Sequence, residues 1–258
     1  MTTRFLTAMP VYNEVQHVNR VLDDVLRFSP GVLVVDDGST DGTTELLAQR
    51  TDVRVLTHQK NQGYGGALIS AFEYAIREKF DVLVTIDSDG QHQPDLIPRF
   101  VAECANADIV SGSRYKQHFT GDSVPPLERR HINERVTAEL NRRLRLHLTD
   151  TFCGFKAYRV EGLKKLDIQE RGYAMPLELW VQAVHAGLKI VELPVPLVYL
   201  DENRSFGGVL DDARTRLEYY HLIIDRSFAA VAPSCLEFPG CETISETTCE
   251  TICRENVG

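Results

Sequence analysis

The alternation of short apolar runs with amphipathic segments constrains this fold more than any other feature of the sequence. Runs rich in Val, Ile and Leu have the length of buried strands and occur at residues 4–8, 32–35, 53–56, 82–86 and 108–110. Apolar residues at helical spacing predict helices at 14–28, after 41, after 63 and at 96–106. Such alternation is typical of a mostly parallel sheet covered by helices. We therefore expect an α/β fold whose ligand site follows the carboxyl edge of the sheet.

The second half of the chain has a different pattern. A polar loop at 116–126 is long enough to act as a lid. The helix expected at 128–148 carries six arginines, which fits either a solvated face or docking on an anionic membrane surface. The remaining expected elements are a short strand after 155, a helix at 176–186, proline-broken edge segments at 189–199 and a final helix at 209–232.

Composition excludes some classes of function. The chain of 258 residues has 43% hydrophobic and 25% charged residues, as ordinary soluble globular proteins do. Its formal net charge of −9 argues against a nucleic-acid binder, which would carry a basic stripe. No stretch has the pattern of a signal peptide or of a membrane span of about 20 apolar residues. We therefore expect a cytoplasmic location, either in solution or peripherally on the cytoplasmic face of a membrane.

The last segment, residues 233–258, is expected to be a poorly ordered tail. It holds four of the six cysteines among Thr, Ser and Glu residues with little hydrophobic periodicity. Without a secretory signal a disulfide framework is not expected, and the cysteine spacing matches no common zinc pattern. Metal capture and lipidation are the weaker alternatives.

Two carboxylates one residue apart follow the run at 82–86. Alternate residues of an extended chain point the same way, so Asp87 and Asp89 are expected to converge at the end of a strand. Carboxylates that close repel each other unless a cation lies between them, and hard oxygen ligands suit Mg²⁺ or Mn²⁺. Gly90 permits a sharp turn after them. The alternative interpretation is a polar turn, because Asp, Ser and Gly are common turn formers.

With these residues in view, the sequence resembles the family-2 glycosyltransferases of GT-A fold, and within them the polyprenol phosphate mannosyl- and glucosyltransferases. The resemblance extends over residues 4–208 and rests on the joint order of the stretches 10–14, 34–41, 61–63, 87–94, 112–114 and 150–156. It implies a Rossmann-like, mostly parallel central sheet flanked by helices, with acceptor-side helices toward the C-terminus. We accordingly expect one domain at 1–232, with a nucleotide-sugar-binding half at 1–115 and an acceptor-side half at 116–232.

The resemblance implies a donor site for a sugar nucleotide. The base and ribose would be held by Pro10, Tyr12, Glu14 and Asp37. An aromatic ring can pack on a base, and carboxylates accept hydrogen bonds from base N–H groups and ribose hydroxyls. Pro10 is also expected to end the first strand.

The same resemblance implies a diphosphate site around the two carboxylates. Asp87, Asp89 and Gln91 would hold the metal, which neutralises the diphosphate leaving group. Further contacts to the donor would come from Ser88, and from Arg114 and Arg204 as diphosphate clamps. Asp89 and Arg114 are therefore candidate catalytic residues.

On the acceptor side, Arg129 and Asn133 fall where the family holds the acceptor phosphate, although serine is more common at the second position. Glu178 falls where hydroxyl-using relatives carry a catalytic acid residue; the alternative is a helix carboxylate on a solvated face. Cys153 stands where serine is usual, so the departures from the family pattern gather on the acceptor side.

Three functions fit these residues. The first is a metal-dependent inverting transferase that moves a hexose from GDP-mannose or UDP-glucose to a polyprenyl phosphate. The second keeps this donor chemistry but uses a soluble or protein-bound hydroxyl acceptor. The third is a nucleotide-sugar-binding module without turnover, which the retention of both Asp87 and Asp89 disfavours.

Overall fold

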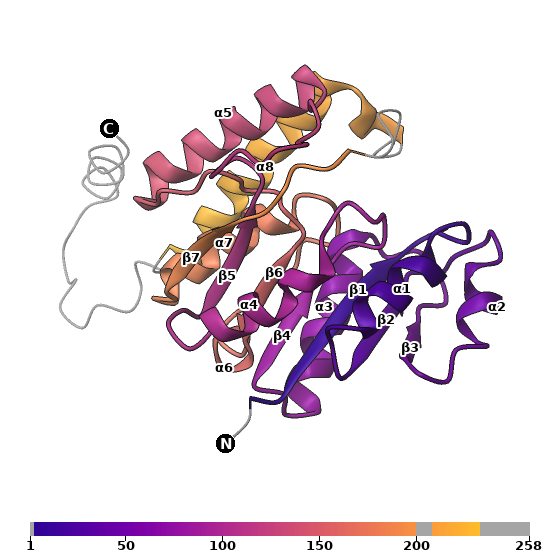
Figure 1. Ribbon diagram of the computed structural model, residues 1–258. Helices are drawn as coiled ribbons and strands as arrows, with labels where there is room; N and C mark the ends of the chain where they lie inside the picture. Colours follow the sequence, from indigo (N-terminus) through magenta and orange to yellow (C-terminus); the bar gives the residue numbers. More distant parts are fainter. Residues whose placement is uncertain (1–2, 200–207, 233–258) are drawn as a thin grey trace, which may run out of the picture.

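The computed structural model describes residues 3–199 and 208–232. These residues form a seven-stranded sheet in the order β3-β2-β1-β4-β6-β5-β7 (Figure 1). The strands are β1 (Phe5–Val11), β2 (Val32–Asp36), β3 (Arg54–Thr57), β4 (Val82–Thr85), β5 (Ile109–Ser113), β6 (Lys156–Arg159) and β7 (Ile190–Pro194). Only β6 runs antiparallel to its neighbours, β4 and β5. The predicted α/β fold with a mostly parallel sheet is therefore confirmed.

The sheet is buried on both faces, which explains why its strands read as continuous apolar runs. In β2, Val32 and Val34 join one apolar cluster while Leu33 and Val35 join the other. Side chains of α1 (Val18–Leu26) and α4 (Ile97–Glu103) belong to the first cluster. Those of α3 (Tyr64–Arg77), α6 (Val160–Leu163) and α7 (Met175–His185) belong to the second. The short helix α2 (Thr43–Leu47) and the 3-10 turn η1 (Pro94–Leu96) complete this part of the chain.

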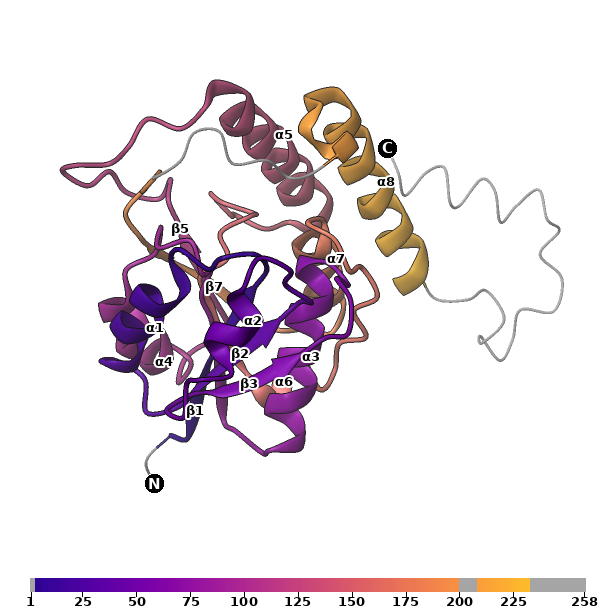
Figure 2. The same ribbon diagram turned by 90° about the vertical axis from the view of Figure 1, so that its right-hand side faces the viewer.

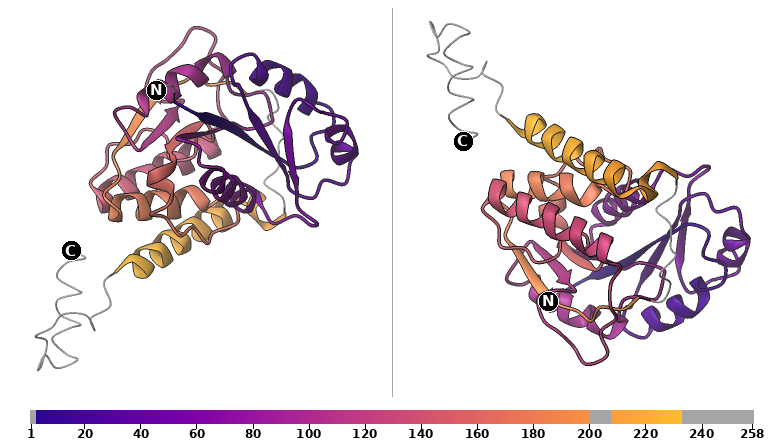
Figure 3. Two further views of the ribbon diagram at one scale, coloured as in Figure 1. Left: turned by 90° about the horizontal axis from the view of Figure 1, so that it is seen from below. Right: turned by 90° about the horizontal axis from the view of Figure 1, so that it is seen from above.

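Two long helices lie over the carboxyl edge of the sheet. They are α5 (Leu127–Leu144) and α8 (Ala213–Val231), which follows the 3-10 turn η2 (Gly208–Asp211). The two helices lie side by side, and α8 also packs on α7 (Figures 2 and 3). Among the described residues, no helix is both long enough and apolar enough to cross a membrane.

Several expected boundaries need correction. Pro10 does not end the first strand, because β1 continues to Val11 alongside β2. The pairing of β1 with β4 has already stopped at Ala8, so the N–H group that Pro10 lacks is not needed on that side. Helix α2 begins after Gly42, which has a φ of 99°, although the carboxylate of Asp41 still accepts a hydrogen bond from the Thr43 N–H.

The end of the chain and one loop lie outside the described residues. The expected tail at 233–258 belongs there, as does Arg204, which falls within residues 200–207. The loop expected at 116–126 is described, and it is tied to the segment after β7. Ser123 N donates to Leu197 O (2.8 Å), and Tyr199 N donates to Ser123 Oγ (3.0 Å).

Candidate functional site

A cavity of about 410 Å³ lies at the carboxyl edge of the sheet and is also lined by side chains of α5 and α8. The strand ends β1, β2, β4 and β5 deliver their following residues to it, as expected for an open α/β sheet. Predicted site residues that line it are Pro10, Tyr12, Glu14, Asp37, Asp87, Ser88, Asp89, Gln91, Arg114, Arg129 and Asn133. The fold thus brings almost the whole predicted site into one cavity, while the individual roles of these residues stay predictions.

Asp87 is held in place by protein donors. Its Oδ1 accepts a hydrogen bond from the Tyr64 hydroxyl (3.0 Å), and its Oδ2 lies 3.2 Å from His92 Nε2. Burial alone would raise the pKa of Asp87, but the hydrogen bond and charge of His92, the Tyr64 hydroxyl and the charge of buried Lys156 together bring it below its ordinary value. A Cβ at Gly154 would overlap this carboxylate, so a larger residue there would displace Asp87 from its observed position. Asp87 is therefore an oriented anion.

The two carboxylates reach the cavity by a different route from the one predicted. Strand β4 ends at Thr85, and residues 88–90 form a turn in which Gly90 has a φ of 73°. Strand alternation therefore cannot align Asp87 with Asp89; the turn brings both to the cavity. The turn is closed by the backbone N–H of Gln91, which donates to Asp89 Oδ1 (3.0 Å).

The residues at this turn fit a divalent cation that is completed by substrate. The described part of the chain has no group of three or more His, Cys, Asp or Glu side chains arranged to hold a metal. Mg²⁺, however, is commonly bound by one or two carboxylates together with substrate phosphates. Asp87, Asp89 and Gln91 supply such hard oxygens at the cavity wall.

Asp37 is anchored by the segment that opens α3. Its carboxylate accepts hydrogen bonds from the backbone N–H groups of Gln62 (2.9 Å) and Gly63 (2.8 Å), and His58 Nδ1 lies 2.6 Å from Oδ1. His58 is itself buried and lies 2.9 Å from the Ser70 hydroxyl. Gly63 has a φ of 92°, in the left-handed region that favours glycine. The stretch 61–63 therefore serves to orient Asp37.

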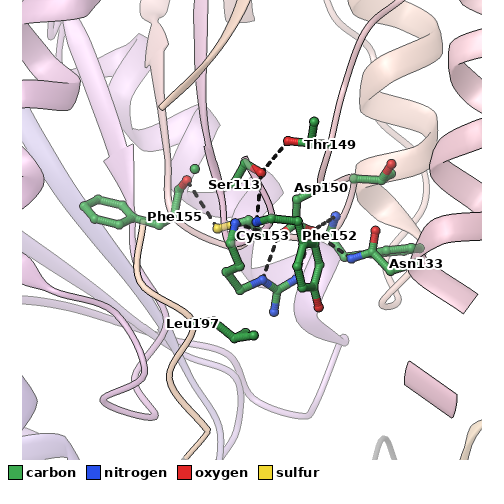
Figure 4. Close-up of polar contacts among 12 residues, drawn as sticks. Ser113, Asn133, Thr149, Asp150, Phe152, Cys153, Phe155 and Leu197 are labelled. Atoms are coloured by element: carbon green, nitrogen blue, oxygen red, sulfur yellow. Dashed lines mark hydrogen bonds and ion pairs between the residues drawn. The ribbon is translucent and has the colours of Figure 1, made fainter. Parts of the chain in front are cut away.

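Arg114 forms a two-point ion pair with Asp150, which lies close to Asn133 in the close-up of Figure 4. The Arg114 Nε donates to Asp150 Oδ2 (2.6 Å) and its Nη2 to Oδ1 (2.9 Å), while the Asn133 amide also donates to Oδ1 (2.8 Å). Burial raises the pKa of Asp150, but the charge and hydrogen bonds of Arg114 and then the amide of Asn133 lower it to about 2. Two predicted ligand-binding side chains are thus locked by one carboxylate that the sequence did not single out, although it lies within the motif at 150–156.

Glu178 has a different position from the one expected. It is buried and does not belong to the cavity wall. Its Oε2 accepts hydrogen bonds from the backbone N–H groups of Gln169 (2.9 Å) and Glu170 (2.6 Å), and Oε1 accepts one from Gln182 (3.1 Å). The prediction of a catalytic carboxylate at the site is therefore not supported, and the alternative of a solvated face is wrong. The carboxylate instead holds the turn before α7.

The far wall of the cavity was missed from sequence. It is largely aromatic and includes Tyr115, Phe152, Tyr173, Tyr199 and Tyr220, while Tyr64 lies next to Asp87 and connects this wall to the acidic side. Tyr64 and Tyr173 stack with ring centroids 5.8 Å apart. Arg216 of α8 adds a cation to this wall. No contiguous motif joins these residues, so only the fold could reveal that they share a surface.

Comparison with known proteins decides the family. Residues 7–167 match the profile described as Glycosyl transferase family 2. The chain belongs to glycosyl transferase family 2. Within this family it is similar to the undecaprenyl-phosphate mannosyltransferase of Micrococcus luteus, with 34% identity over 223 residues that cover 81% of this chain and 90% of that protein. It is also similar to the polyprenol monophosphomannose synthase of Mycolicibacterium smegmatis, with 34% identity over 207 residues (75% and 77% of the two chains).

Two solved structures with similar backbones support the fold. Glucosyl-3-phosphoglycerate synthase from Mycobacterium tuberculosis in complex with UDP has a TM-score of 0.65 to this chain at 20% identity, covering 89% of this chain and 80% of that one. A second structure of that enzyme, with Mn²⁺, UDP and glucosyl-3-phosphoglycerate, has a TM-score of 0.64 at 19% identity. At such identities the likeness establishes the GT-A fold. The family-2 protein described here is accordingly a nucleotide-sugar glycosyltransferase.

Proposed function

We propose that this family-2 glycosyltransferase is metal-dependent, inverts the anomeric configuration, and moves a hexose from GDP-mannose or UDP-glucose to a polyprenyl phosphate. The observation that carries the proposal is one cavity that is lined both by strand-end carboxylates and by Arg129 of α5. The mannosyltransferases at 34% identity, whose names specify polyprenyl phosphates, support this acceptor.

The donor would lie along the strand ends. Tyr12 is 46% exposed and lines the cavity, so its ring is available to pack on a base. Glu14 and the anchored Asp37 would accept hydrogen bonds from base and ribose, with Pro10 beside them and Ser88 near the diphosphate. Arg204, which lies outside the described residues, is proposed only from the resemblance.

The diphosphate would lie at the turn after β4. Asp87, Asp89 and Gln91 would hold Mg²⁺ or Mn²⁺ there, and the bound ion would neutralise charge on the leaving group. Tyr64 and His92 keep Asp87 oriented before the donor arrives, so that little reorganisation is needed. Arg114, which Asp150 holds rigidly, would stabilise the same charge from the β5 side.

The acceptor would enter from the side of α5 and α8. A phosphate monoester has its second pKa near 6, so it is largely ionised at neutral pH and needs cations for positioning rather than a base. The position of Glu178 agrees with this chemistry, because a carboxylate engaged by two backbone N–H groups outside the cavity wall is poorly placed to deprotonate a hydroxyl. Attack by a phosphate oxygen on the anomeric carbon, opposite the departing diphosphate, would invert that centre.

We further propose that residues 1–232 act as one domain, since both apolar clusters are built on the same sheet. The decisive experiment offers the purified protein radiolabelled GDP-mannose and UDP-glucose with Mn²⁺, and compares a polyprenyl phosphate with the corresponding alcohol as acceptor. Transfer to the phosphate and not to the alcohol is expected. Transfer to the alcohol would favour a hydroxyl acceptor. Nucleotide binding without either product or donor hydrolysis would favour the non-catalytic module.

A further inference from the structure

The charged side chains of the cavity are segregated. Its acidic residues, Glu14, Asp37, Asp87 and Asp89, all follow strands β1, β2 and β4. Its arginines lie at the other side, after β5 and on the helices α5 and α8. Arg114 is paired with Asp150, and Arg129 of α5 and Arg216 of α8 add two further cations to this side of the cavity. An anion in the cavity is therefore favoured beside α5 and α8.

Arg216 is the helical cation that the sequence did not predict. It lies outside residues 7–167, where the family profile matches, and it lines the cavity from α8. Tyr220, one turn further along α8, lines the same wall, so one face of the helix is turned to the cavity. The Arg216 side chain is only 3% exposed.

The guanidinium of Arg216 is fixed by its neighbours. Its Nη1 donates to the backbone carbonyl of Leu210 (2.6 Å), and its Nη2 donates to Glu128 Oε1 (2.6 Å). The Glu128 side chain is 57% exposed, whereas that of Arg216 is buried. Solvent therefore screens the negative charge of Glu128 more than it screens the positive charge of Arg216. Because the guanidinium of Arg216 is already oriented and little screened by solvent, it can form a charge-assisted hydrogen bond with an anion in the cavity.

We propose that Arg216 of α8 is a further residue that binds the phosphate monoester of the acceptor, beside Arg129 of α5. The inference rests on the proposed function and adds a residue of α8 to its acceptor site. A dianionic headgroup suits two arginines that approach from separate helices, because each guanidinium can engage different phosphate oxygens. Lipid-borne and soluble phosphate monoesters share this chemistry, so the test includes both.

The competing explanation is that Arg216 only joins α5 to α8. The chain offers a matched control for it. Arg143 also joins these helices, through a contact of its Nη1 with Asp225 Oδ1 (2.6 Å), but it does not line the cavity. Arg143→Gln therefore removes an inter-helix arginine without changing the charge of the cavity wall.

The experiment measures binding of a short-chain isoprenyl monophosphate and of glycerol phosphate by calorimetry, in wild type, Arg216→Gln and Arg143→Gln. We expect Arg216→Gln to weaken isoprenyl monophosphate binding about 10- to 100-fold and Arg143→Gln to weaken it less than about threefold. If Arg216→Gln weakens the binding of both ligands, the site recognises the phosphate itself. If it weakens binding of the isoprenyl compound and glycerol phosphate does not bind even the wild type, the phosphate comes from a lipid. Equal losses in the two variants, or none in Arg216→Gln, would overturn the proposal.

Thermal unfolding and GDP or UDP affinity with Mn²⁺ are recorded on the same samples. A parallel loss of nucleotide affinity in Arg216→Gln would indicate general disruption and would also overturn the proposal. If Arg216→Gln does not fold, Arg216→Lys replaces it; lysine keeps the charge but lacks the planar fork, so a loss of about three- to tenfold is expected, and unchanged affinity contradicts the inference.

Failure of the proposed function looks different. If isoprenyl monophosphate binds through Arg216 but receives no sugar, the transfer reaction is wrong and the anion site stands. If sugar is transferred with the same acceptor KM in wild type and Arg216→Gln, the reaction stands and the role of Arg216 is wrong.

Discussion

The two walls of the cavity are built in different ways. The acidic wall comes from short segments that directly follow parallel strands, and each of its carboxylates lies within a contiguous motif such as 34–41 or 87–94. The opposite wall comes from aromatic and arginine side chains of α5, α8 and the loops around β7 and α7, which are far apart in the sequence. The comparison teaches that a donor site can be recognised from motifs, whereas an acceptor site assembled from helices requires the fold.

The first and largest test concerns the acidic wall. Asp89→Asn should lower kcat by about 10³-fold and remove most Mn²⁺-dependent nucleotide binding, because a neutral amide cannot offset a divalent charge. Transfer assays over a range of Mn²⁺ concentrations measure both effects. The matched control is Asp95→Asn, an exposed position in the 3-10 turn η1 just beyond the site. Full activity of the Asp89 variant, or of wild type in excess chelator, would refute the metal site and with it the proposed contrast between the walls.

The second test concerns the carboxylate beneath the arginine wall. The pKa of Asp150 is about 2 in the folded protein and 3.8 ordinarily, so the folded state binds this proton less readily than the unfolded state. The contacts of ionised Asp150 with Arg114 and Asn133 should therefore contribute, net of its burial, about 2 kcal/mol to the free energy of unfolding above pH 4, and this contribution should fade as the pH falls toward 2. Urea unfolding between pH 5 and pH 2.5 measures it.

Asp150→Asn provides the comparison for that titration, because the amide has no proton to gain over this range. The variant should be less stable at pH 5, and its loss of stability on acidification should be smaller than that of wild type. Identical slopes for the two proteins would show that the Arg114–Asp150 pair does not govern this region.

The third test concerns Glu178 of α7, the predicted acceptor-side residue that does not line the cavity. Glu178→Gln should lower the free energy of unfolding by about 1 kcal/mol, because two backbone N–H groups lose a charged acceptor. It should change kcat by less than about threefold. A loss of about 10²-fold or more in kcat, with folding and nucleotide affinity intact, would restore a general base at this position and favour a hydroxyl acceptor.

The smallest effect is expected at the outer surface of α5. Arg142 and Arg145 are exposed there, while Arg143 is engaged by Glu139 and Asp225. If the protein docks on anionic membranes, each exposed arginine contributes at most about 1 kcal/mol, and vesicle co-sedimentation should weaken with salt and in the double variant Arg142→Ala, Arg145→Ala. Arg99→Ala serves as the control, because Arg99 is exposed on α4, which packs on the opposite face of the sheet from α5. No binding to anionic vesicles at low salt would leave the helix as a solvated face.

The sequence by itself determined the parallel strands and the carboxylates that follow them. Local apolar runs specify which segments are strands, and in a parallel sheet the residues after each strand must gather at one edge. For this reason the order of strands and polar residues along the chain is enough to predict that Asp37, Asp87 and Arg114 lie together. The prolines around β7 likewise predicted its position at the edge of the sheet.

Only the tertiary structure decided what no local pattern encodes. The antiparallel strand β6 lies between β4 and β5, which brings Asp150 under Arg114 and Gly154 against Asp87. Glu178 was proposed as a site residue from the family resemblance, and its position in the sequence could not show that its carboxylate holds the turn before α7 instead of lining the cavity. Arg216 and Tyr220 of α8 reach the cavity wall because α5, α7 and α8 pack on one another. Such packing depends on contacts between residues distant in sequence, so the acceptor side of the cavity became visible only once the chain was folded.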